Sequence, residues 1–168
     1  QPFDSTRKRM STIHAALAGS IPERAAGSER PANTLLVAGP GGEIHRYRKI
    51  HPFSYAGEDR HYQAGEDFVT VTIDELRFTL FVCYDLRFAE LFRKLALEGA
   101  EIICLPAEWP KPRQEHWNTL LRARAIENQL FVAAANCCGV QGKLDFFGQS
   151  QLISPLGRVL AAADEEET

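Results

Sequence analysis

The feature that most constrains the fold is an apolar, β-branched run that ends at a cysteine. Residues 75–82 have the composition of a buried strand in a mainly parallel sheet, and Cys83 follows directly. Residues 88–99 then repeat apolar side chains at three- and four-residue spacing, as an amphipathic helix does. Ligands of open α/β sheets gather where strands end and helices begin. We therefore predict an α/β fold with Cys83 at the rim of a sheet.

The position of Cys83 favours chemistry at its thiol. Backbone N–H groups at the start of a helix lack partners within the helix, and the helix dipole favours negative charge there. Both effects are expected to lower the pKa of Cys83 from the ~8.5 of a free thiol, and the thiolate is the form that attacks. The alternative is that Cys83 is a small core residue, because free cysteine is among the most buried residue types.

The rest of the chain alternates strands and helices. Residues 100–105 and 130–135 are predicted to be buried strands, and residues 114–128 a helix between them. Hairpins at residues 34–49, 68–82 and 149–163 flank this core. On the helix we expect two sets of residues, the inward Trp117, Leu120, Leu121, Ala125 and Ile126, and the outward Arg122, Arg124 and Glu127. This order predicts a layered α/β fold with reactive groups at one edge of a sheet.

Three other stretches carry weaker patterns. Residues 1–17 are predicted to be weakly helical, and residues 19–33 to be a surface loop. Residues 54–66 are predicted to be a polar loop without periodicity of its own. A loop of that length is more often functional than not.

Composition bounds the class of protein. The length of 168 residues fits one domain spanning residues 1–168, and the net charge of −3 gives no attraction to nucleic acid or to an anionic membrane. No apolar stretch approaches the ~20 residues that span a bilayer, and no secretory signal is evident, so we expect a cytoplasmic protein. The cysteines form no CxxC pair, so we expect reduced thiols and no metal site. They are Cys83, Cys104, Cys137 and Cys138.

Several motifs match a known family in order and spacing. They are YRKIHPF at 47–53, GE at 57–58, CYDLRFAE at 83–90, PAEWP at 106–110, HW at 116–117 and RARAIENQ at 122–129. With these motifs the chain resembles the nitrilase superfamily of carbon-nitrogen hydrolases over roughly residues 19–163. The last motifs look most like the omega-amidase-type branch, whose members hydrolyse the terminal amide of small dicarboxylic acid monoamides.

The resemblance implies a four-layer αββα sandwich of the nitrilase type and a Glu-Lys-Cys site. Cys83 takes the nucleophile position, Lys49 the lysine position, and Glu58 the position of an auxiliary glutamate that orients Lys49 or a reacting group. In the implied reaction the thiolate attacks an amide carbon, ammonia leaves, and water hydrolyses the thioester. The oxyanion would be stabilised by the Lys49 ammonium and the backbone N–H of Tyr84. No cofactor is required.

Two further residues are candidates for binding the substrate. Arg87 is expected to bind a substrate carboxylate, or else to form a structural ion pair with Asp85 or Glu90. Trp109 is expected to line the pocket, or else to be a core aromatic residue at the end of a strand. As in most family members, we expect a homodimer or a larger homo-oligomer.

The chain also departs from the family pattern. The general-base glutamate of the family lies in a Pro-Glu motif well before the lysine, whereas Glu23, Glu29 and Glu43 are the glutamates before Lys49 here. Glu23 follows a proline, but its segment resembles a later part of the family. We therefore expect a sandwich truncated at its N-terminus and also at its C-terminus. Without the base and the first strands, these 168 residues alone are expected to be inactive and poorly soluble.

Two alternatives to an omega-amidase stay open. A nitrilase or an N-carbamoyl amidohydrolase would use the same scaffold with a different pocket. A catalytically dead fragment or pseudoenzyme would serve only as an interaction subunit, and the absent base supports that view.

Overall fold

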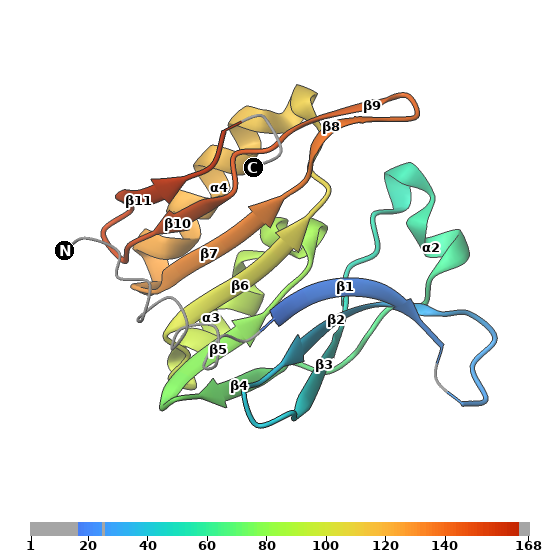
Figure 1. The fold of residues 1–168 in the computed structure, drawn as a ribbon, viewed down its shortest axis with the longest axis horizontal. Helices are drawn as coiled ribbons and strands as arrows, with labels where there is room; N and C mark the ends of the chain where they lie inside the picture. The colour runs from blue at the N-terminus through green and yellow to red at the C-terminus, as the bar shows by residue number, and fades with distance from the viewer. Residues whose placement is uncertain (1–16, 25, 165–168) are drawn as a thin grey trace.

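The computed structural model describes residues 17–24 and 26–164 (Figure 1). Its strands form two sheets and a small two-stranded hairpin. The first sheet is antiparallel, in the order β1-β2-β3. Its strands are β1 (Leu17–Glu23), β2 (Ala32–Ala38) and β3 (Ile44–Arg48). The predicted hairpin at 34–49 is thereby confirmed, with residues 39–42 as its turn.

The second sheet has the order β11-β10-β7-β6-β5-β4. Its strands are β4 (Thr70–Ile73), β5 (Leu76–Leu80), β6 (Ile102–Ala107), β7 (Phe131–Asn136), β10 (Gln151–Ile153) and β11 (Val159–Ala162). The central β5, β6 and β7 are parallel, while the pairs at both edges are antiparallel. The predicted strands at 100–105 and 130–135 and the hairpins at 68–82 and 149–163 are therefore confirmed. The hairpin of β8 (Cys138–Gln141) and β9 (Leu144–Phe147) was not predicted.

The two longest helices of the described residues cover one face of the second sheet. These are α3 (Ala89–Leu97) and α4 (Gln114–Asn128), and Figure 1 shows them side by side on that face. The structure also contains a short helix α2 (Glu58–His61) and the 3-10 helices η1 (Ser54–Ala56), η2 (Cys83–Arg87) and η3 (Lys111–Arg113). None of the described helices is long and apolar enough to cross a membrane.

The layers share one hydrophobic core. Ile103 and Val132 are register partners on the face that α4 covers, and both are fully buried. Tyr47 of β3 is also fully buried and meets Phe81, just past β5, edge to face at 5.9 Å between ring centres. The helical layer, the six-stranded sheet and the three-stranded sheet are three layers of the expected αββα sandwich. Because the layers meet at Tyr47 and Phe81, the ends of β3 and β5 are brought together.

Two residues of α4 were predicted wrongly. Arg124 was expected on the surface, but it is 5% exposed, and Ile126 was expected inward, but it is 53% exposed. Arg124 lies one turn from Leu121 on the buried face, where its guanidinium donates to the carbonyl of Leu86 and stacks over Phe92. A buried arginine with these partners interrupts the apolar pattern from which the inward face was predicted.

Two predicted loops were also wrong. The segment 19–33 contains most of β1 and the start of β2. Pro22 is tolerated within β1 because β1 is an edge strand, where the missing N–H of proline need not remove a hydrogen bond between strands. The segment 54–66 contains η1 and α2, and a left-handed Gly57 (φ 77°) separates them. Of the predicted helical segment 1–17, residues 1–16 lie outside the described residues, and Leu17 begins β1.

Candidate active site

Cys83 lies where the chain leaves the central sheet. Phe81 and Val82 extend β5 as buried residues, and Cys83 opens the 3-10 helix η2. Its φ of 47° lies in the left-handed region, which costs a non-glycine residue of the order of 1–3 kcal/mol unless its surroundings enforce it. The Sγ atom points at the main-chain carbonyl of Glu108, 3.9 Å away at the end of β6. The turn thus presents the thiol at the carboxyl ends of β5 and β6.

A buried carboxylate enforces this turn and ties it to the three-stranded sheet. Asp85 is 0% exposed, and its Oδ2 accepts hydrogen bonds from the Val82 amide at 3.0 Å and the Tyr47 hydroxyl at 2.8 Å. Its Oδ1 accepts from the His51 amide at 3.0 Å. Burial and then the Asp85 charge raise the pKa of Tyr47, so the phenol stays a neutral donor. Asp85 therefore joins the nucleophile turn to the residues on both sides of Lys49.

Lys49 and Glu58 form a buried ion pair beside the thiol. Lys49 is 3% exposed, and its Nζ lies 2.6 Å from Oε2 of Glu58. Glu58 is held by further donors, the amide of Phe53 at 2.6 Å and the side-chain amide of Asn33 at 3.0 Å. Lys49 also acts electrostatically on Cys83. The structure therefore brings together the three residues to which the sequence assigns catalytic roles.

Burial opposes ionisation of the thiol. It raises the pKa of Cys83, and the positive charge of Lys49 and the hydrogen bond to the Glu108 carbonyl only partly offset it. The predicted lowering of this pKa is therefore wrong for the described chain. Two physical reasons explain the difference. Packing around Val82 and Cys83 desolvates the sulfur, and the helix that follows directly is the short η2, because α3 begins only at Ala89.

The pKa of Glu58 moves the other way. Burial pushes this pKa up, but the hydrogen bonds from Lys49, Asn33 and the Phe53 amide, with the Lys49 charge, bring it below its ordinary value. At neutral pH the pair is therefore a carboxylate bound to an ammonium. A buried ammonium with one fixed partner is able to stabilise a second negative charge that forms next to it.

A pocket opens beside Cys83. It encloses about 280 Å3 of empty space, part of it continuous with solvent, and Cys83, Tyr84, Arg87 and Trp109 all line it. Three of these are the residues predicted to bind substrate. Trp109 fulfils both predicted roles, because it lines the pocket and is packed against Trp117 with 5.6 Å between ring centres.

Arg87 does not form the structural ion pair that was the alternative to substrate binding. Asp85 is occupied by its own donors, and within the described part of the chain neither Asp85 nor Glu90 lies within 4.0 Å of an Arg87 nitrogen. Instead, Nη2 of Arg87 lies 3.0 Å from Nδ1 of His116, and the guanidinium stands 5.1 Å from the centre of the Trp109 ring. Among the described residues, its charge is thus presented to the pocket without an acidic partner.

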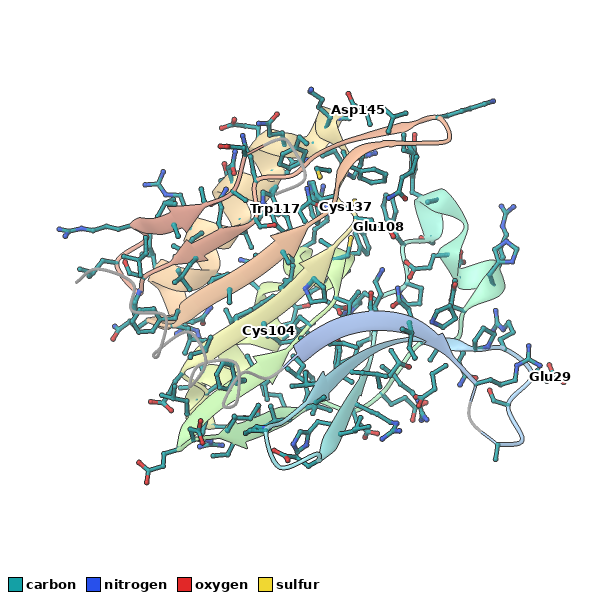
Figure 2. All side chains as sticks on the ribbon, viewed as in Figure 1. Glu29, Cys104, Glu108, Trp117, Cys137 and Asp145 are labelled. Atoms are coloured by element: carbon teal, nitrogen blue, oxygen red, sulfur yellow. The ribbon has the colours of Figure 1, made fainter. Side chains whose placement is uncertain are left out.

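The other cysteines differ from Cys83. Burial raises the pKa of Cys104, within β6, to about 11. Burial, and next the charge of Glu108, raise the pKa of Cys137 to about 11. Figure 2 shows Glu108 and Cys137 close together at the ends of β6 and β7, with Cys104 farther along β6. Within the part of the chain that the structure describes, neither thiol has a lysine like Lys49 to favour its anion.

Several residues of the site were not predicted. Asn136 ends β7 and fixes Trp109, since its Oδ1 accepts from the Trp109 amide at 2.7 Å and its Nδ2 donates to the Trp109 carbonyl at 3.3 Å. Phe53, Glu108 and Arg113 also line the pocket. An asparagine at the end of a strand was a usable signal, and Phe53 ends the motif at 47–53, although the sequence analysis gave it no role. No group of three potential metal ligands occurs within residues 17–24 and 26–164.

The glutamates that precede Lys49 lie elsewhere. Glu23 ends β1 and pairs with Arg46 at 2.8 Å and with Arg48 at 3.8 Å, so it does not serve the thiol. Glu29 lies far from the labelled ends of β6 and β7 in Figure 2, and Glu43 is exposed in the turn before β3. None of the three lines the pocket at Cys83.

The chain was compared with known proteins. A model of the carbon-nitrogen hydrolase family matches residues 6–168. The 2-oxoglutaramate amidase of Bacillus subtilis is 44% identical over 136 residues, which are 80% of this chain and 52% of that protein. The omega-amidase YafV of Escherichia coli K12 is 40% identical over 156 residues, which are 92% of this chain and 59% of that protein.

Solved structures are similar as well. A carbon-nitrogen hydrolase superfamily protein from Xanthomonas campestris, with an arsenic adduct in its active site, matches with a TM-score of 0.87 and 37% identity over 96% of this chain and 63% of that chain. A cysteine-to-alanine mutant of an amidase of the nitrilase superfamily from Nesterenkonia matches with a TM-score of 0.83 and 30% identity over 96% of this chain and 62% of that chain. The chain spans about half to three-fifths of the length of the curated relatives described above.

Proposed function

Because the chain belongs to the carbon-nitrogen hydrolase family, we propose that the protein hydrolyses the terminal amide of a small dicarboxylic acid monoamide through a thioester on Cys83. The observation that carries the proposal is the setting of the Cys83 thiol: the charges of the buried Lys49–Glu58 pair act on it, and it lines a pocket with an arginine that has no acidic partner among the described residues. The names of the relatives support the substrate class, since they include a 2-oxoglutaramate amidase and an omega-amidase.

In the proposed reaction the Cys83 sulfur attacks the amide carbon. A C–S bond forms, and the carbonyl oxygen becomes an oxyanion next to the Lys49 ammonium and the backbone N–H of Tyr84. One oxyanion donor typically lowers such a barrier by roughly 2.7–4 kcal/mol. The C–N bond then breaks, the nitrogen takes a proton and leaves as ammonia, and water hydrolyses the thioester to a carboxylate and the free thiol.

Glu58 is proposed to position Lys49. Its three donors fix the carboxylate, and the 2.6 Å contact fixes the ammonium in turn. The ammonium therefore needs no reorganisation when the oxyanion forms, which is the condition for strong electrostatic stabilisation. Arg87 is proposed to attract the substrate carboxylate, while Tyr84 and Trp109 form the walls on which the carbon chain of the substrate lies.

Proton transfer is the step of the proposed reaction for which the described residues offer the weakest support, because the carboxylates near the thiol already accept other hydrogen bonds. The carboxylates that act on Cys83 are Glu58 and Asp85, and both are committed to donors of their own. Burial also keeps the thiol largely protonated at pH 7. General acid-base catalysis contributes about 10²–10⁴-fold, so we expect the turnover rate of the 168-residue chain on its own to be lower by about that factor, which leaves the chain close to inactive.

The test measures ammonia release and acylation of Cys83. The chain is incubated with 2-oxoglutaramate and with butyramide, beside the Bacillus subtilis 2-oxoglutaramate amidase as a reference, and Cys83 is analysed by peptide mass spectrometry. We expect an acyl group of the substrate on Cys83, its loss in Cys83→Ala, and slow ammonia release that favours 2-oxoglutaramate. Robust release without Cys83, or no acylation by any amide, would reject the proposal.

The same preparation separates the rival functions. A panel with a nitrile and an N-carbamoyl amino acid, assayed for ammonia and carbon dioxide, distinguishes a nitrilase or a carbamoyl hydrolase from an amidase. Selective labelling of Cys83 by iodoacetamide at neutral pH supports an active thiol, whereas equally slow labelling of all four thiols supports a catalytically dead interaction subunit. We also propose a homodimer or larger homo-oligomer, which light scattering on a size-exclusion column measures directly.

A further inference from the structure

A second arginine lines the pocket that contains Cys83. Arg113 is the last residue of η3, directly before α4, and it lines the same pocket as Cys83 and Arg87. Its guanidinium carbon lies 5.7 Å from the ring centre of Phe53 and 5.4 Å from that of Tyr55. The side chain is half-buried. Two aromatic rings therefore support the guanidinium.

The backbone of Arg113 is held as firmly as its side chain. Its carbonyl accepts a hydrogen bond from the indole N–H of Trp109 at 2.8 Å, and its amide donates to the carbonyl of Pro110 at 3.0 Å. Trp109 is itself fixed by Asn136. The arginine thus stands on a rigid support, and its orientation relative to the thiol is fixed by the end of β6.

The charge of Arg113 is not neutralised within the described part of the chain. No carboxylate there lies within 4.0 Å of its guanidinium, and the guanidinium makes no hydrogen bond to a described residue. The acidic residue that shares the pocket is Glu108, and the neighbouring Glu115 is exposed on the first turn of α4. With Arg87 on the other side, the pocket holds two guanidinium groups and one carboxylate, which leaves it positively charged.

We propose that Arg113 binds the carboxylate at the end of the substrate remote from the amide, and thereby selects monoamides of dicarboxylic acids over neutral amides. This inference rests on the proposed function and deepens it. A guanidinium presents N–H groups in a planar fork that matches a carboxylate, and stacking on aromatic rings leaves that edge free. One N–H of Arg87 faces His116, whereas the guanidinium of Arg113 makes no hydrogen bond to a described residue, so all of its N–H groups are available to a ligand.

The lining of the pocket agrees with a ligand of this class in its chemistry, because it combines a thiol, aromatic rings and two guanidinium groups. The aromatic walls contact the methylene groups, Cys83 meets the amide, and the two arginines take the carboxylate.

The experiment measures protection of Cys83 from iodoacetamide, which needs no turnover. Glutaramate and glutaramide are compared as protecting ligands, because they have equal length and differ in one carboxylate. The variants are Arg113→Gln and Arg113→Lys, with Arg158→Gln, which removes an exposed charge outside the pocket, as the control. The rate of Cys83 labelling without ligand reports whether the site itself is intact.

We expect glutaramate to protect the unmodified chain at far lower concentration than glutaramide does. Loss of one charge-assisted hydrogen-bond pair in Arg113→Gln should raise the half-protecting concentration of glutaramate by about 10- to 100-fold. Glutaramide should protect both chains equally. Arg113→Lys should fall between the two, since an ammonium keeps the charge but not the fork, and Arg158→Gln should behave as the unmodified chain.

Three outcomes would overturn the inference. They are equal protection by the two ligands in the unmodified chain, an equal loss for both ligands in Arg113→Gln, and no loss for either. The second of these would show a structural role for Arg113. A selective loss of glutaramate protection combined with no acylation by any amide would reject the proposed reaction and leave the carboxylate site standing.

Discussion

At the scale of the residue, the thiol of Cys83 is subject to opposing influences. Burial raises its pKa, whereas the ammonium of Lys49 lowers it, and Glu58 and Asp85 add a weaker upward effect. Since the thiolate is the reactive species, the balance among these groups determines how fast Cys83 reacts at a given pH. Lys49 is therefore expected to matter even before any substrate is bound.

Replacing Lys49 tests this balance. Lys49→Met removes the charge that lowers the Cys83 pKa and leaves Glu58, which raises it, so the pKa should move farther up. The rate of Cys83 alkylation by iodoacetamide should then fall at pH 7, and its rise with pH should shift to more alkaline values. Stopped aliquots from pH 6 to pH 10, analysed by peptide mass spectrometry, give the profile. Lys143→Met, at an exposed turn, is the control, and an unshifted profile in Lys49→Met would contradict the expectation.

The lowered pKa of Glu58 leads to a separate prediction about the stability of the fold. Its pKa is lower in the folded chain than its ordinary value of ~4.3. A carboxylate of this kind stabilises the fold fully above the unfolded pKa, and the contribution is lost as the pH falls through the folded pKa. Glu58→Gln should therefore be less stable than the unmodified chain at pH 6, and the difference in unfolding free energy should shrink toward pH 3. Urea denaturation at both pH values measures it, and a constant difference would refute the link.

At the scale of the element, Asp85 holds the β3 end and the η2 turn together. Each of its oxygens faces a backbone N–H, that of His51 at 3.0 Å and that of Val82 at 3.0 Å. An asparagine would replace one oxygen by an NH2 group, so one of these buried donors would lose its acceptor. A buried donor without a partner costs about 1–3 kcal/mol.

Asp85→Asn should therefore lower the unfolding free energy by about that amount, and loss of the Asp85 charge, which raises the pKa of Cys83, should shift alkylation of Cys83 to lower pH. Asp145→Asn is the matched control, since Asp145 is 52% exposed and lies 3.7 Å from Lys111. Surface changes of that kind stay within about 0.5 kcal/mol. Urea denaturation and the alkylation profile together measure both effects. If Asp85→Asn were as stable as Asp145→Asn, the carboxylate would not be what joins the two elements.

The same network explains which features were predictable from sequence. The apolar runs of β5, β6 and β7 and the period of α4 are local patterns, and each was placed within a few residues. Edge strand β1 contains glycine and proline, and the hairpin of β8 and β9 is exposed along most of its length, so neither has a pattern of buried residues. Motif resemblance predicted catalytic roles for Lys49, Glu58 and Cys83, and the structure places the Lys49–Glu58 pair where its charges act on the thiol. The raised thiol pKa depends on tertiary burial, and the role of Asp85 on contacts 34 and 38 residues away in the chain, which spacing does not reveal.

At the scale of the whole molecule, the two faces of the six-stranded sheet differ in their cover. Val132 and Ile153 pair in register on the face toward α4, and both are fully buried. On the opposite face Leu152 pairs with Ala133, and the described residues leave Leu152 40% and Phe131 41% exposed. Apolar side chains that share an exposed sheet face favour self-association.

A charge on that face should therefore reduce association of the 168-residue chain. Leu152→Lys places an ammonium among apolar neighbours and should lower the weight-average mass found by sedimentation at a given concentration. Because Leu152 is only partly buried, the unfolding free energy should change by about 1 kcal/mol or less. Leu97→Lys is the control, since Leu97 is 80% exposed at the end of α3, away from this face. Equal effects of the two substitutions would mean that association follows net charge, whereas an effect of Leu152→Lys alone would locate it on the face of β7 and β10.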